Sequence, residues 1–320
     1  MPKVSVVVPV YNVEKYIEQC ARSLFEQTLD DIEYIFVDDK SSDKSIEILG
    51  RILKEYPDRK PQCIIHTMEE NSGQAAVRKW GIEHAIGDYI IHCDSDDWVE
   101  HDMYSLMYEK AKMEDADIVI CDFVLNNGRK ECSVAPKIKT TKDYQKGILT
   151  KAVHCSTWNK FVRRELYSKP ILYPKENYAE DLAIMGQLFY YAKKIEYIPE
   201  GLYHYRYNPS SISKQKGKEK LLLSFRQTCS NAALVERFYQ DKGIDHQLQY
   251  ALDSMKCFER DRLIVLTADK EYYQMWKNTF PEINKRILNN PYISWKNKLR
   301  YVLVRLHIYP LYAKWRGLVP

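Results

Sequence analysis

The sequence lacks an apolar run of about 18 residues or more, the length that a membrane-spanning helix needs. We therefore expect no membrane span. The first residues, MPKVSVVVPVYN, hold only a short apolar run and continue without a small-residue cleavage site. This segment predicts a buried strand rather than a signal peptide.

The sequence also lacks cysteine pairs two or three positions apart, the spacing that is typical of zinc sites. Several cysteines instead sit inside apolar patterns, which favours buried, reduced thiols in a cytosolic protein over disulfides or zinc ligands. The eight cysteines are Cys20, Cys63, Cys93, Cys121, Cys132, Cys155, Cys229 and Cys257.

Two glycine-rich phosphate-binding fingerprints are missing as well. No G-x-G-x-x-G follows the first apolar run, and no G-x-x-x-x-G-K-[ST] occurs anywhere in the chain. These absences exclude a dinucleotide fingerprint and a P-loop, so a phosphorylated ligand would have to be bound in another way.

Acidic residues are scarce at the C-terminal end. Between positions 282 and 320, eight lysines and arginines stand against one acid, Glu282. The net charge of +4 therefore resides mainly in the last segment.

The 320 residues, 45% of them hydrophobic and 29% charged, predict one large globular domain with an appendage rather than a disordered chain. Apolar runs alternate with segments of helical spacing over the first 125 positions, which is typical of an α/β sheet with parallel strand order. We expect strands near 4–10, 32–37, 62–66, 89–92 and 116–125. Helices are expected after Asn12 and Ser41–Ser42, which would cap them, and through Trp80.

Polar side chains follow the ends of these expected strands. In an open α/β sheet, ligands bind outside the carboxyl ends of the strands, so these residues should meet at one edge. The residues are Tyr11, Asn12, Asp38, Asp39, Asn71 and the DSDD stretch from Asp94 to Asp97.

The DSDD stretch itself places clustered carboxylates at the tip of a core strand. Two aspartates one residue apart can share Mg²⁺ or Mn²⁺, which takes oxygen ligands and bridges carboxylates to a diphosphate. The alternative, a polar turn with helix-capping aspartates, stays open on this stretch alone.

A series of ordered motifs resembles the inverting family 2 glycosyltransferases. The motifs are VSVVVPVYNVEKYIEQCARSLFEQT, IEYIFVDDKSSDKS, ENSGQAAVRKWGIEHAIGDYI, CDSDDW and, more weakly, the segments up to about residue 213. The resemblance implies a GT-A fold, a mixed sheet flanked by helices, with a helical C-terminal extension. It also implies a nucleoside-diphosphate sugar donor, most commonly a uridine diphosphate sugar.

The resemblance also assigns the donor site. Tyr11 would lie against the base or ribose, Asp39 would bind the nucleobase, and Asp96 would hold the metal with Asp94 at the ribose or the metal. The expected donor-site residues are Pro9, Tyr11, Asn12, Asp39, Asn71, Arg78, Asp94, Ser95 and Arg206, with Asp96 and Asp94 as ligands of Mn²⁺ or Mg²⁺. Two positions depart from the family pattern: Lys40 replaces a usual glycine and Lys79 a usual asparagine.

Inverting transfer needs a base on the acceptor hydroxyl, and a carboxylate across the cleft suits that role. Asp181 in ENYAEDLAI matches the usual base of the family, with Glu180 as support or acceptor contact. The alternative is that both acids merely complement a helix dipole. Arg206 would offset charge on the leaving diphosphate unless it is a solvated loop arginine, and Trp158 is expected to pack.

We expect a catalytic domain over 1–215, with a donor half over about 1–100 and an acceptor half over 101–215, followed by a helical region over 216–320. Aromatic and basic residues mix over 295–316, which suits the surface of an anionic membrane. A solvated basic face and a homodimer contact are the alternatives. The enzyme would then be cytoplasmic, or peripheral on the inner face of the membrane.

The sequence therefore predicts a glycosyltransferase that acts on a glycan or lipid-linked acceptor in cell-surface polysaccharide synthesis. An inactive nucleotide-sugar-binding module and a nucleic-acid-binding protein are the alternatives. Acidic clusters at the strand ends argue against nucleic acid, because they would repel its phosphates.

Overall fold

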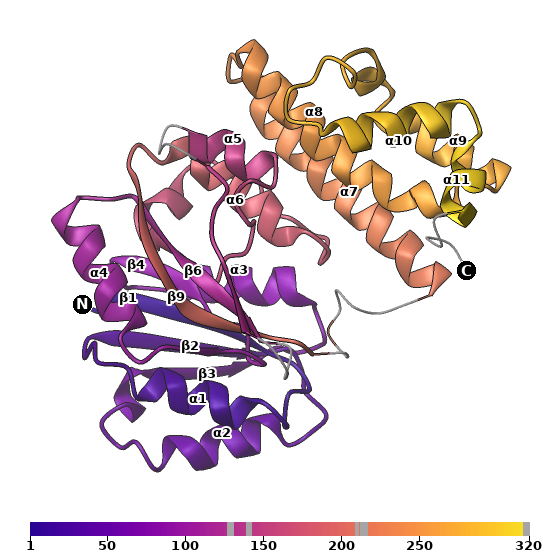
Figure 1. Cartoon of the computed structure of the whole chain (residues 1–320). Coiled ribbons are helices and arrows are strands. Elements are labelled where there is room, and N and C mark those ends of the chain that lie inside the picture. Colours follow the sequence, from indigo (N-terminus) through magenta and orange to yellow (C-terminus); the bar gives the residue numbers. More distant parts are fainter. Residues whose placement is uncertain (127–130, 139–142, 209–210, 212–216, 316–320) are drawn as a thin grey trace.

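The computed structural model describes residues 1–126, 131–138, 143–208, 211 and 217–315. Within these residues a central sheet runs in the strand order β3-β2-β1-β4-β8-β6-β9-β5, and β7 pairs with β6 (Figure 1). The strands are β1 (Val4–Val10), β2 (Ile32–Asp38), β3 (Cys63–Thr67), β4 (Tyr89–His92), β5 (Trp98–Val99), β6 (Ile118–Asn126), β7 (Glu131–Val134), β8 (Lys160–Arg163) and β9 (Ile195–Arg206).

The four strands β1 to β4 are parallel, as the alternating pattern predicts. β1 lies between β2 and β4, and its valines alternate between two cores: Val6 and Val8 face one, and Val7 faces the other. A strand that is buried on both faces needs apolar residues at nearly every position, which explains the continuous run VSVVVPV.

The sheet becomes mixed beyond β4, since β8 is antiparallel to both β4 and β6. β6 pairs in parallel with β9 across an irregularity around Asp122, and β9 pairs antiparallel with β5. This confirms the mixed sheet. The pairings join segments far apart in the chain, and the sequence pattern predicted strands only for β1 to β4 and β6.

Helices cover both faces of the sheet. α1, α2 and α4 supply apolar residues to one core, and α3 and α5 to α8 supply the other. The helices are α1 (Ile17–Phe25), α2 (Ser45–Leu53), α3 (Gln74–His84), α4 (Met103–Met113), α5 (Tyr144–Leu149), α6 (Glu180–Tyr191), α7 (Lys218–Gln240), α8 (His246–Arg260), α9 (Lys270–Asn278), α10 (Trp295–Arg305) and α11 (Tyr309–Trp315).

The expected caps of the first two helices are wrong. α1 begins at Ile17, well after Asn12, and Asn12 has a left-handed backbone with φ of 52°. The side-chain oxygen of Asn12 instead accepts hydrogen bonds from Ser42, 30 positions along the chain. α2 begins at Ser45, where the carboxylate of Asp43 accepts the backbone N–H. Tertiary contacts between the loops after β1 and β2 thus replace local capping.

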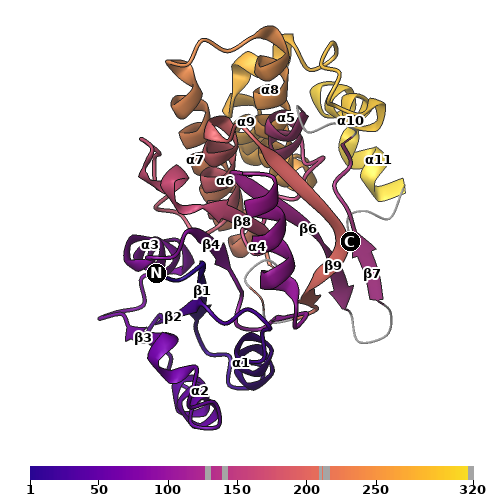
Figure 2. The same cartoon turned by 90° about the vertical axis from the view of Figure 1, so that its left-hand side faces the viewer.

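The C-terminal helices are bound to the sheet domain through α7 and α8, whose Val235 and Leu252 belong to the second core. α9 to α11 build a third core around Trp276. Figure 2 shows α7 to α11 gathered at the end of the molecule opposite α1 and α2. The expected domain boundary at 215/216 lies outside the described residues.

None of the helices in the described ranges is both long and apolar enough to span a membrane, in line with the sequence. All eight cysteines are free thiols, as expected. Burial is less uniform than expected, because Cys132 on β7 is exposed at the edge of the sheet.

Candidate active site

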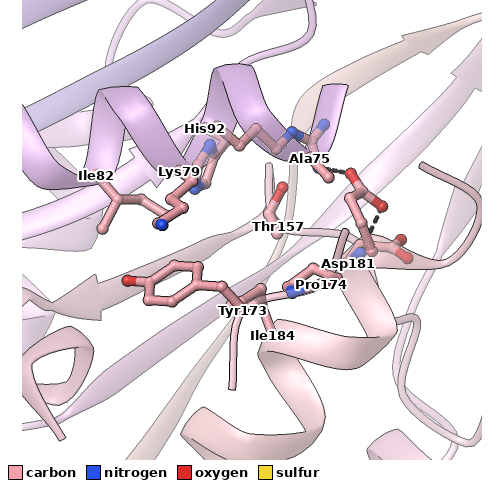
Figure 3. A pocket seen from close by; sticks show the side chains of 11 residues that line it. Ala75, Lys79, Ile82, His92, Thr157, Tyr173, Pro174, Asp181 and Ile184 are labelled. Atoms are coloured by element: carbon pink, nitrogen blue, oxygen red, sulfur yellow. Dashed lines mark hydrogen bonds and ion pairs between the residues drawn. The ribbon is translucent and has the colours of Figure 1, made fainter. Parts of the chain in front are cut away.

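A cleft of about 520 Å³ opens at the carboxyl ends of β1, β2 and β4. Polar side chains meet there because parallel strands end at one edge of the sheet. Eight of the expected donor-site and metal residues line this cleft: Pro9, Tyr11, Asn12, Asp39, Asn71, Asp94, Ser95 and Asp96. Arg78, Glu180 and Asp181 line a small adjoining pocket, drawn in Figure 3.

The first wall of the cleft comes from the loops after β1 and β2. Tyr11 is 48% exposed, so its ring is available to a ligand. Lys40 adopts φ of 64°, which places a lysine in the left-handed conformation that glycine would adopt without strain. The left-handed backbone at Lys40 costs about 1–2 kcal/mol of strain, which the glycine expected from the resemblance would avoid.

Asp39 fixes the loop that leads into α3. Its two carboxylate oxygens accept the backbone N–H groups of Ser72, at 2.7 Å, and Gly73, at 2.9 Å. Burial raises the pKa of Asp39, although these two hydrogen bonds oppose the shift. The loops after β2 and β3 are thereby held against each other at the edge of the cleft.

Two asparagines in the cleft were not predicted from the sequence. The side-chain oxygen of Asn177 accepts the N–H of Ala75 at the start of α3, and Asn208 also lines the cleft. A Cβ on Gly73 would lie 2.3 Å from the Asn177 side chain, and Gly73 has φ of 84°, a conformation that strains any residue with a Cβ. Asn177 lies in ENYAED and Asn208 in HYRYNPSS, but no local pattern marks either one as a cleft residue.

Asp97 has a structural role within DSDD. It is 1% exposed and accepts hydrogen bonds of 2.7 Å from the Tyr203 hydroxyl and from the Arg206 backbone N–H. These contacts tie the tip of β4 to β9. The rigid tip then presents Asp94 and Asp96 to the cleft.

Asp94 and Asp96 are a suitable pair of ligands for a divalent cation. Asp96 Oδ2 accepts a hydrogen bond of 2.9 Å from Asn208, and burial followed by the charge of Asp94 raises the pKa of Asp96. The described residues contain no cluster of three or more His, Cys, Asp or Glu side chains that could hold a metal. Mg²⁺ and Mn²⁺ in phosphate-transfer sites are bound by one or two carboxylates together with substrate phosphates, so the two aspartates fit such an ion.

Arg78 joins the DSDD loop after β4 to the start of α6. From α3, its guanidinium binds Asp94 Oδ1 at 2.5 Å through Nη2 and Glu180 Oε1 at 2.7 Å through Nη1. The side chains of Arg78 and Glu180 are each 8% exposed. The two carboxylates raise the pKa of Arg78, so the cation is retained despite burial.

Asp181 lies beside this bridge at the first turn of α6 (Figure 3). Its Oδ1 accepts the N–H of Leu182 at 2.7 Å, and its Oδ2 accepts the thiol of Cys155 at 3.2 Å. Ala179, the residue before the pair of acids, has φ of 61°. A left-handed alanine costs about 1–2 kcal/mol, and such strain is typical of functional sites.

Arg206 does not line the cleft in the described residues, although its predicted role is on the donor diphosphate. Its Nε donates to the backbone oxygen of Asp96 at 2.8 Å, and its guanidinium lies 4.6 Å from the Trp98 ring centre. Arg206 thus holds the DSDD loop. Trp158 is 4% exposed and stacks on Tyr203, so its ring packs as expected.

The acidic loop predicts a characteristic pH dependence of stability. Burial raises the pKa values of Asp96 and Asp97 above those of the unfolded chain. Each group therefore contributes fully to the free energy of unfolding below the pKa that it has in the unfolded chain. This contribution is lost as the pH rises through the pKa that the group has in the folded protein. We expect the metal-free protein to lose stability from about pH 4 upward, by up to about 1.4 kcal/mol per pH unit for each proton.

Denaturant unfolding at a series of pH values, in a chelator, measures this slope. Asp97→Asn should flatten it, whereas the exposed Asp58→Asn should not. A slope that is unchanged in Asp97→Asn would contradict the assignment.

The chain matches the family model described as glycosyl transferase family 2 over residues 5–169. It is 34% identical over 225 residues to the glycosyltransferase EpsJ of Bacillus subtilis. This match covers 67% of this chain and 64% of the relative. EpsH of the same organism is 34% identical over 73% of this chain and 70% of the relative. The minor teichoic acid biosynthesis protein GgaB, also of Bacillus subtilis, is 30% identical. This match covers 63% of this chain and 23% of GgaB.

Solved structures show the same fold at low identity. S. aureus TarS 1-349 in complex with UDP superposes with a TM-score of 0.70 at 19% identity, over 98% of this chain and 92% of that one. The mannosyltransferase PcManGT from Pyrobaculum calidifontis, in complex with GDP-Man and Mn²⁺, has a TM-score of 0.59 at 17% identity, over 98% and 88%. With the family model covering more than half of its residues, this chain belongs to glycosyl transferase family 2.

Proposed function

We propose that the protein is a metal-dependent inverting glycosyltransferase that moves a sugar from a nucleoside-diphosphate sugar to a hydroxyl of its acceptor. The observation that carries this proposal is the buried bridge from Asp94 through Arg78 to Glu180. This bridge holds the cleft and the Glu180–Asp181 pair at a fixed distance from each other. A direct displacement needs such a fixed geometry, because the acceptor hydroxyl must meet the anomeric carbon in line.

Asp181 is the proposed base. It would take the proton of the acceptor hydroxyl as the new glycosidic bond forms and the bond to the diphosphate breaks. The hydrogen bonds from Leu182 and Cys155 orient its carboxylate and leave the remaining lone pairs for the acceptor. Glu180, paired with Arg78, would keep the helix start in place and contact the acceptor.

The proposed metal is Mn²⁺ or Mg²⁺, held by Asp96 and Asp94. When bound, the ion would act as a Lewis acid that stabilises negative charge on the leaving diphosphate. Burial, followed by repulsion from Asp94, raises the pKa of Asp96, and pairing with the ion would relieve that repulsion. The Mn²⁺ in the PcManGT complex supports this choice by similarity of fold.

The proposed donor is a uridine diphosphate sugar. Tyr11, exposed at the mouth of the cleft, would stack on the base, and Asp39 would receive a hydrogen bond from it at the cost of a loop contact. The UDP complex of the structurally similar TarS supports a uridine nucleotide. The acceptor is proposed to be a glycan or lipid-linked chain of a surface polysaccharide, which the teichoic acid role of the related GgaB supports.

A thermal-shift titration with nucleoside diphosphates tests the proposal. Ligand at about 100 times its Kd stabilises the folded state by about 2.7 kcal/mol, so UDP with Mn²⁺ should raise Tm by several degrees. Asp96→Asn should reduce the shift and remove its dependence on Mn²⁺, because one of the two metal ligands is lost.

The exposed Asp58→Asn is the matched control and should respond like the parent protein. If UDP shifts Asp96→Asn with the same Mn²⁺ dependence, the metal assignment fails. If no nucleoside diphosphate shifts the folded parent protein, the chain is an inactive module of the family.

A further inference from the structure

α10 exposes an apolar stripe on its outer side. Trp295 is 68% exposed, Leu299 44% and Leu306, directly after the helix, 60%. These positions are four and seven residues apart, a spacing that places them on one side of a helix. Two further exposed apolar side chains follow along the chain: Ile308, 44% exposed, and Leu311 on α11, 71% exposed.

The opposite side of α10 packs against the rest of the protein. Tyr301 and Val304 are 7% and 1% exposed and belong to the third core. At about 100° of rotation per residue, their direction differs from that of the exposed stripe by about half a turn. The helix therefore has two apolar sides: one is buried in the third core, and the other is largely exposed, although Val302 and Leu303 pack partly against that core.

Basic side chains flank the exposed stripe on both sides. By the same rotation, Lys296 and Arg300 lie on one flank, and Lys298 and Arg305 on the other. Within the described ranges, Lys296, Lys298 and Arg305 form no ion pair. An apolar stripe between two basic flanks is the arrangement of helices that lie in a membrane interface, with the apolar side inserted and the cations at the headgroups.

We propose that the outer side of α10, with Ile308 and Leu311, binds the surface of an anionic lipid bilayer. The positive charge of this surface favours an anionic bilayer over a second copy of the chain. A second copy of the chain docking through the same face would bring like charges together in a two-fold contact, whereas anionic headgroups neutralise them. Each lysine or arginine near such a surface strengthens binding by about fivefold, and the inserted indole and leucines add an apolar contribution.

This surface is separate from the active site. α10 packs with α9 and α11 in the third core, beyond α7 as seen from the sheet, and the cleft residues lie at the ends of β1, β2 and β4 (Figures 1 and 2). Lipid binding through α10 would keep the enzyme beside the bilayer while the cleft stays open. The inference therefore does not depend on the identity of donor or acceptor.

Flotation of the full chain with two kinds of vesicle tests the proposal. Vesicles of phosphatidylcholine with phosphatidylglycerol should carry the protein upward, and added salt should release it. Phosphatidylcholine alone should bind it far more weakly. Replacing Lys296, Lys298 and Arg305 by glutamine should weaken binding on the order of a hundredfold. Leu299→Gln with Leu306→Gln should weaken it about tenfold or more.

Ile86→Gln with Met113→Gln is the matched control, because these apolar residues are at least as exposed as Leu299 and Leu306 but lie far from α10 in the sequence. It should bind vesicles like the parent protein, and all variants should keep the parent nucleotide-induced thermal shift. Equal binding of the parent protein to both kinds of vesicle would overturn the proposal. So would a dimer in sedimentation velocity that Leu299→Gln with Leu306→Gln dissociates while no vesicle binds.

Discussion

Asp181→Asn is expected to lower kcat about 10²- to 10⁴-fold while nucleotide binding stays as in the parent protein. The amide cannot take a proton from the acceptor hydroxyl, and a general base contributes an effect of this size. The Asp181 side chain lines the small pocket rather than the large cleft that would hold the nucleotide. Measuring transfer and the nucleotide-induced thermal shift on the same preparation separates the two effects.

Glu165→Gln serves as the control for Asp181→Asn, because Glu165 is an exposed acid in the same half of the chain. It should retain full transfer. If Asp181→Asn transfers sugar at the parent rate, Asp181 is not the base. If it loses nucleotide binding together with transfer, the residue supports the donor site instead.

Arg78→Met is expected to reduce the free energy of unfolding by about 3–5 kcal/mol, because it leaves Glu180 and Asp94 without their cation in a buried place. Burial raises the pKa of Glu180, while Arg78 opposes that shift. Without Arg78, the folded pKa lies still higher above the unfolded value. The loss of stability should therefore be small at acidic pH and should grow as pH rises through the folded pKa.

A double-mutant cycle with Glu180→Gln isolates this interaction. At a pH above the folded pKa of Glu180, Arg78→Met with Glu180→Gln should be more stable than Arg78→Met alone, because no ionised carboxylate then remains opposite the missing guanidinium. Arg22→Met is the matched control: Arg22 also binds two carboxylates, Glu18 and Glu55, but its side chain is 34% exposed. Its loss should cost about 1 kcal/mol or less. If Arg78→Met and Arg22→Met lowered the free energy of unfolding by the same amount, the buried bridge would stabilise the fold no more than an exposed one.

The second prediction concerns a contact between residues that are distant in the sequence. Arg78 and Glu180 are separated by 102 positions, and nothing near either residue indicates that they pair. The motifs identified each of them singly. The structure adds that one guanidinium binds both Asp94 and Glu180, so that the loop after β4 and the start of α6 are linked through a single side chain.

Local sequence determined the parallel half of the sheet. Continuous apolar runs such as VSVVVPV can only be buried on both faces, and the helical segments between them force parallel order. The same reasoning placed Tyr11, Asp39 and Asp94 at one edge, because parallel strands end together. The basic, aromatic character of the C-terminal helices was also evident from composition.

The tertiary structure decided what each polar group binds. Asp97 is buried and accepts a hydrogen bond from Tyr203, and Arg206 donates one to the backbone oxygen of Asp96. Both donors lie on β9, which pairs with β5 and β6. It also decided which side of α10 is buried, because the sequence holds two apolar stripes and only the third core selects between them. Strand propensity and helical periodicity act over a few residues, whereas these choices depend on contacts made by segments a hundred positions apart.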